Sequence, residues 1–173
     1  MIRFIAIAAL LLTGVAAAQQ RSQPRSQAPA QQELGRFEDW IAYTAEENGQ
    51  KVCYAGVKAK ASAPDLSGRG DVILYVTHRP GSRDQVMMLS GYAYPSGAEA
   101  TLAVDGGTAQ PLYTGGRAAF ARAGRSAVAA FRRGNEAVVK GPPPRGSGQV
   151  TDRFSLIGFT AAYEAIGKAC PGR

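Results

Sequence analysis

Residues 71–78 read DVILYVTH, and this stretch decides the fold. Along an extended chain its side chains alternate between two faces, and both are largely apolar: Val72, Leu74 and Val76 on one, Ile73, Tyr75 and Thr77 on the other. A strand that is apolar on both sides is typical of the centre of a sheet. Arg79-Pro80-Gly81 ends it, since proline removes a backbone donor.

Further strand patterns lie on both sides of this segment. Apolar residues recur with a period of two in residues 37–43, 51–57, 85–92, 99–104, 109–113, 136–140 and 149–156. Asn48-Gly49 and Asp105-Gly106 are turn sequences that predict hairpins. About eight short strands broken by Gly and Pro, without strand–helix alternation, predict a mainly β, antiparallel β-sandwich. Trp40 is the predicted core anchor of the first strand.

Two helices complete the predicted domain. The alanine-rich segment 117–133 predicts a short helix over residues 126–133, with Ser126 as its N-cap and Gly134 as its C-terminal stop. Residues 160–170 predict a C-terminal helix, because four apolar side chains share one face: Ala162, Tyr163, Ile166 and Ala169.

The N-terminal residues predict export. A short basic start is followed by the apolar run 4–15 and by three alanines, which together read as a signal peptide over residues 1–18. The run is shorter than the roughly 20 residues that span a bilayer. Residues 19–32 are rich in Gln, Ser, Pro and Arg and predict a disordered linker, so the domain occupies 33–173. We therefore expect a periplasmic, outer-membrane-associated or secreted protein.

Cysteine usage agrees with export. Cys53 and Cys170 are the only cysteines. An even pair in an oxidising compartment predicts a disulfide, which would join the last helix to the second strand. A redox role would need a Cys-x-x-Cys motif or a nearby base, and the sequence has neither.

The residues that usually carry enzyme chemistry are scarce. His78 is the only histidine, and its place at the end of a strand favours a structural role. The sequence lacks a nucleophile elbow, a zinc ligand set and a phosphate-binding loop, so we predict no catalytic residue, metal or cofactor. The neighbouring carboxylates Glu38-Asp39 and Glu46-Glu47 leave a hydrolase acting on cell-envelope polymer as the alternative.

Positive charge points to a class of partner. The chain carries a formal net charge of +7. Five arginines lie within a segment without acids and form the candidate anion-binding residues: Arg117, Arg122, Arg125, Arg132 and Arg133. Anionic lipid and acidic polysaccharide are the expected envelope or surface partners, while export excludes cytoplasmic nucleic acid. A solvated helix face is the competing interpretation. A third function, accessory subunit of an envelope complex, would require an exposed apolar patch.

An ordered set of short motifs resembles a known family. The first part is Phe37-Glu38-Asp39-Trp40, Lys51-Val52-Cys53-Tyr54, Gly70-Asp71, Thr77-His78-Arg79-Pro80, Gly91-Tyr92 and Tyr94-Pro95. The second and more specific part is Asp152, Phe154-Ser155-Leu156, Gly158-Phe159-Thr160-Ala161-Ala162 and Lys168-Ala169-Cys170-Pro171. From about residue 35 to residue 171 the chain resembles the invasion associated locus B family.

This resemblance implies an immunoglobulin-like β-sandwich, export, and a link to host-cell entry in some pathogens. It supplies no catalytic residues. Many members carry a further cysteine shortly after the tryptophan, where this chain has Thr44, so Cys53–Cys170 is the only intramolecular disulfide available here.

Overall fold

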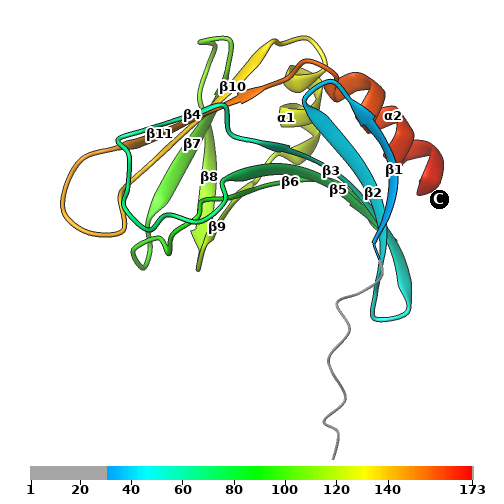
Figure 1. Ribbon diagram of the computed structural model, residues 1–173, viewed down its shortest axis with the longest axis horizontal. Helices are drawn as coiled ribbons and strands as arrows, with labels where there is room; N and C mark the ends of the chain where they lie inside the picture. The colour runs from blue at the N-terminus through cyan, green and yellow to red at the C-terminus, as the bar shows by residue number, and fades with distance from the viewer. Residues whose placement is uncertain (1–30, 173) are drawn as a thin grey trace, which may run out of the picture.

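A computed structural model describes residues 31–172, which form eleven strands and two helices (Figure 1). The predicted signal peptide and most of the predicted linker lie outside the described residues. In chain order the elements are β1 (Gln32–Phe37), β2 (Trp40–Glu47), β3 (Gln50–Lys58), β4 (Ala61–Ala63), β5 (Ile73–Arg79), β6 (Ser82–Leu89), β7 (Glu99–Val104), β8 (Gln110–Gly115), β9 (Ala118–Ala121), α1 (Gly124–Phe131), β10 (Glu136–Gly141), β11 (Val150–Ser155) and α2 (Phe159–Ala169).

All strands join one antiparallel ladder that bends back on itself. Its order is β1-β2-β3-β5-β6-β9-β8-β7-β10-β11-β4. After β3 the chain crosses to the far end of the ladder, where the Lys60 N–H donates to the Arg153 carbonyl and β4 pairs with β11. In Figure 1 both helices lie above the arch that β3, β5 and β6 form. The predicted mainly β, antiparallel sandwich with two helices is confirmed.

Several predicted boundaries are wrong for local reasons. Residues 37–43 are not one strand, because Glu38 takes a positive φ of 51° and makes a tight turn between β1 and β2. The short strands β4 and β9 are not among the predicted strands; β9 lies in the alanine-rich segment, ahead of the helix predicted there. Each is ordered by partners distant in sequence: β11 for β4, and β6 and β8 for β9.

Helix α1 begins two residues before its predicted start. Ser126 is not its N-cap; Ala123 holds that position and makes no side-chain cap. Gly124 explains the difference, because a Cβ on it would lie 1.9 Å from the Asp84 carbonyl oxygen of β6. The missing side chain allows the first turn of α1 to pack directly on the sheet.

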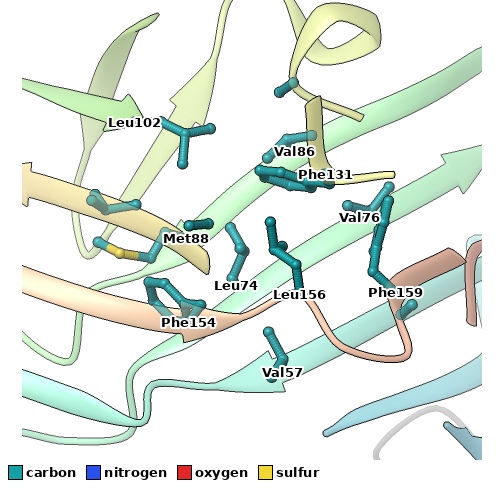
Figure 2. Close-up of a cluster of buried hydrophobic side chains, with 14 of the residues drawn as sticks. Val57, Leu74, Val76, Val86, Met88, Leu102, Phe131, Phe154, Leu156 and Phe159 are labelled. Carbon is teal, nitrogen blue, oxygen red and sulfur yellow. The ribbon is translucent and has the colours of Figure 1, made fainter. Parts of the chain in front are cut away.

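The core lies between the helices and the inner face of the sheet, the face that carries Trp40, Leu74 and Met88. Figure 2 shows the cluster, with Phe131 of α1 and Phe159 of α2 among side chains from several strands. Trp40 is fully buried; its indole N–H donates to the Ser155 carbonyl at 3.0 Å, and its ring packs on Phe159.

A disulfide ties α2 to the sheet. Cys53 of β3 and Cys170, which follows the last turn of α2, are bonded, with their Cα atoms 5.9 Å apart. Helix α2 also contacts β1, β2 and β5, so the bond adds a covalent link to a helix that already covers the inner face.

Motif residues far apart in sequence meet around a buried ion pair. The Arg69 guanidinium donates two hydrogen bonds of 2.8 Å to the Asp152 carboxylate and a third, of 2.7 Å, to the Ser90 carbonyl. The two charged side chains are 7% and 2% exposed. Beside them Gly91 has a positive φ of 77°, and a Cβ there would lie 2.4 Å from the Gly70 carbonyl oxygen. Arg69, together with the motif residues Gly91 and Asp152, holds the loop before β5 against the sheet.

His78 lies in the interior rather than at a strand edge, because α2 covers it. Its side chain is 1% exposed, and its ring packs edge-on against Tyr163. The Asp84 backbone N–H donates to Nδ1 at 3.3 Å, whereas Nε2 has no partner among the described residues. Burial lowers the pKa of His78, and the positive charge of Arg83 lowers it further, against the opposing effect of the Asp84 carboxylate. Folded His78 is therefore neutral.

We expect His78 to make the protein less stable in mild acid. An unfolded histidine binds a proton below about pH 6.5, whereas folded His78 stays neutral, so the unfolded state holds more protons in acid. The free energy of unfolding therefore decreases as the pH is lowered, by at most about 1.4 kcal/mol per pH unit. His78→Asn, which keeps an acceptor near the Asp84 N–H, should lose less stability between pH 7 and pH 5. Urea unfolding at both pH values tests this. Equal losses in both proteins would contradict it, and no other histidine complicates the comparison.

Candidate functional site

An apolar row crosses the outer face of the sheet, the face opposite the core. Alternate residues of each strand point away from the core, and the strand register aligns one such residue from each of six neighbouring strands. In order they are Ile41, Gly56, Tyr75, Met87, Phe120 and Tyr113, here called the outer row. At a strand spacing of about 4.8 Å the outer row is about 24 Å long.

The outer row is partly open to solvent. Tyr113 is 44% exposed, and the other members are intermediate in exposure. Their rings pack against neighbours on the same face: Tyr113 stacks on Phe120 with centroids 5.1 Å apart, and Tyr54 lies between Tyr43 and Tyr75 at 5.4 and 6.0 Å. Helix α2 packs on the inner face through Trp40 and His78, and α1 packs on β6.

A groove of about 360 Å³ opens at one end of the outer row. It lies between Ile41 and Tyr43 on one side and Tyr75 on the other. Gly56 lets the Tyr75 ring approach its backbone closely, since a Cβ on Gly56 would lie 2.8 Å from that ring. This hollow, here called the Gly56 groove, falls within the size range of small-ligand sites and is lined mainly by apolar groups.

Charged side chains stand at the rim of the Gly56 groove. Lys58 pairs with Asp71 at 3.1 Å, and both side chains are largely exposed. Lys60 and Asp39 also border the groove, and neither forms an ion pair with another residue of 31–172. The rim therefore presents one uncompensated cation and one uncompensated anion.

Tyr75, which lines the groove, and its neighbour Tyr54 are neutral at physiological pH. Burial raises the pKa of Tyr75, and the nearby charges of Asp71 and Tyr43 raise it further. Burial is also the main cause of the raised pKa of Tyr54. Their hydroxyls remain protonated and can donate hydrogen bonds.

The carboxylate pairs considered for hydrolysis do not form a site. Glu38, Asp39, Glu46 and Glu47 are all exposed, and Glu47 accepts hydrogen bonds from Arg79. A second cavity, of about 260 Å³, holds only Asp105 among carboxylates. That carboxylate accepts backbone N–H groups that follow α1. Within residues 31–172, no group of three or more His, Cys, Asp or Glu could hold a metal ion.

The five candidate arginines are divided among several elements. Arg117, in the turn before β9, donates to the Gly91 carbonyl at 2.8 Å. Arg122 lies over Tyr113 and 3.7 Å from Glu99, and Arg132 lies over Tyr163 and 3.7 Å from Glu164. Arg125 is in the first turn of α1, and Arg133 lies beyond its last turn, at the second cavity. Of the five arginines, Arg122 and Arg132 thus each contact both a carboxylate and a tyrosine ring.

Sequence reasoning missed the outer row. Its members come from six strands, and β9 was not predicted as a strand. The available signal was the apolar character of both faces of residues 71–78, which was used only to place that strand at the centre of the sheet.

None of the helices in the described part of the chain is long and apolar enough to cross a membrane.

Comparison with known proteins gives a consistent result. The family model described as "Invasion associated locus B (IalB) protein" matches residues 40–167. The crystal structure of invasion associated protein B from Bartonella henselae has a similar fold, with a TM-score of 0.55 and 18% sequence identity over 78% of this chain and 95% of that chain. No curated protein sequence matches the chain. Because the family model covers well over half of its length, the chain belongs to the invasion associated locus B family.

Proposed function

We propose that this protein is a non-enzymatic binding module of the cell envelope or cell surface, working in the periplasm, at the outer membrane or after secretion. It holds its partner through the outer row. The observation that carries the proposal is a continuous, partly exposed apolar row on a sheet whose opposite face already has a filled core. The largest apolar patch on a monomeric protein is often a functional contact surface.

Two further observations support a binding role. The family is named for invasion, as is the solved structure from Bartonella henselae, and an invasion-related protein at the surface needs a contact surface. The carboxylates that would serve a hydrolase are exposed and separated from any cavity that holds a second acid. A binding module therefore fits the geometry better than an envelope hydrolase, and an accessory subunit would use the same row.

Position-specific photo-crosslinking tests this proposal. A photoreactive residue at Met87, in the middle of the outer row, should crosslink to an envelope or surface component in cells that export the full chain. The matched control is Lys140, an exposed position on β10 outside the row, which should give little crosslinking. Equal yields at both positions, or none at Met87, would contradict a contact through the outer row.

A further inference from the structure

We propose that the Gly56 groove binds a phospholipid with a zwitterionic headgroup, such as a phosphoethanolamine lipid. The acyl chain lies against Ile41 and Tyr75 and along the outer row, while Lys60 binds the phosphate and Asp39 binds the ammonium. This inference rests on the proposed function and names the partner of the same surface.

The groove suits an acyl chain. Its apolar lining includes the side chains of Ile41, Tyr43 and Ile73 and the Tyr75 ring, which lies against the Gly56 backbone. The outer row continues from Tyr75 to Met87 and Phe120, so an apolar chain has a path beyond the groove. Methionine adapts readily to ligands of varied shape, and apolar area removed from water drives the association.

The rim suits a headgroup that carries both charges. Lys60 and Asp39 both border the groove, and neither has an ion-pair partner within residues 31–172. An anionic headgroup would satisfy Lys60 but would lie close to the Asp39 carboxylate, whereas a phosphate joined to an ammonium complements both. The charges at the rim therefore favour a zwitterion over the anionic lipid expected from net charge alone.

Two other occupants fit less well. A sugar polymer needs a partner for most of its hydroxyls, since unpaired hydroxyls are costly to bury. The hydrogen-bonding side chains of the groove are limited to two tyrosines and the charged residues of the rim, with no Asn, Gln, Ser or Thr. A second copy of the chain needs about 800 Å² per partner for a standard interface. The outer row, about 24 Å long and about 14 Å wide with its flanking residues, offers less than half of that area.

Binding of monomeric lysophospholipids to the purified mature protein tests the proposal by calorimetry. Lysophosphatidylethanolamine should bind at one saturable site. Ile41→Gln should weaken binding at least tenfold, since burial of an isoleucine side chain is worth roughly that factor or more. Val138→Gln is the matched control, a partly exposed aliphatic residue on β10 outside the groove, and should leave the affinity unchanged. Thermal unfolding of both variants shows that each is folded.

The two rim residues should give opposite charge signatures. Lys60→Gln should weaken both lysophosphatidylethanolamine and the anionic lysophosphatidylglycerol, by about two- to fivefold for an exposed ion pair. Asp39→Asn should weaken only the ethanolamine lipid and should improve binding of the anionic one.

The inference would be overturned by the absence of binding of either lipid, by equal effects of Ile41→Gln and Val138→Gln, or by binding that depends on Arg132 and Arg133 instead of the groove. An acidic oligosaccharide that binds in place of the lipids would overturn it as well. If crosslinking at Met87 succeeds while the lipids fail to bind, the proposed function stands and only the lipid assignment is lost.

Discussion

Replacing Asp152 by alanine is expected to lower the free energy of unfolding by about 3–5 kcal/mol, because it leaves a buried cation without its counter-charge. Arg69 is 7% exposed, and two of its three hydrogen bonds end on this carboxylate. The Ser62 hydroxyl, which donates to Asp152 at 2.7 Å, loses its acceptor too. Urea unfolding followed by the fluorescence of the single, fully buried Trp40 measures the loss.

A neighbouring ion pair provides the matched control. Arg153, the next residue of β11, pairs with Glu136 at 2.6 Å, but these side chains are 50% and 44% exposed. Glu136→Ala should therefore cost less than about 1 kcal/mol. The double variant Arg69→Met/Asp152→Leu should recover most of the stability that Asp152→Ala loses, since it removes both charges. If Asp152→Ala costs no more than Glu136→Ala, the buried pair does not stabilise the fold as argued.

Removing the disulfide has the second large effect. With a sequence separation of 117 residues, the chain-entropy estimate for Cys53→Ala/Cys170→Ala is a loss of about 4–5 kcal/mol. Alanine suits both positions, because Cys53 is fully buried among apolar side chains and Cys170 packs against the same core. Chemical unfolding of the native and variant proteins measures the difference.

A reducing agent provides the internal control for this experiment. These are the only two cysteines, so reductant has no other thiol target. Reduction should destabilise the native protein by nearly as much as the double substitution and should leave the variant unchanged. A native protein whose unfolding midpoint does not respond to reductant would show that α2 docks without help from the covalent link.

Elements with strong local patterns were predicted well. Strand β7 has the bounds expected from its alternation, and α2 differs from its predicted range by one residue at each end. The short strands β4 and β9 could not be predicted, since three or four residues hold too little alternation and their order comes from partners elsewhere. The start of α1 depends on the close approach of Gly124 to β6, and helix propensities do not predict such a tertiary contact.

The candidate site was less accessible to sequence reasoning than the fold. Arg69 and Asp152 are 83 residues apart, and nothing local marks either as buried. The five arginines form a cluster in sequence, but the contacts of Arg117, Arg122 and Arg132 with other parts of the chain could not be read from it. Only the strand order brings Ile41, Tyr75 and Phe120 into one row.

The sequence by itself determined the class of fold and the two helices, because these depend on residue type and local spacing. It also determined the pairing of the two cysteines, because the chain has no other cysteine. The tertiary structure alone decided the buried ion pair, the outer row and the Gly56 groove. The physical reason is that the alternation of apolar and polar residues predicts which side of a strand faces the core. A surface site depends instead on which strands become neighbours and in what register, and long-range packing determines both.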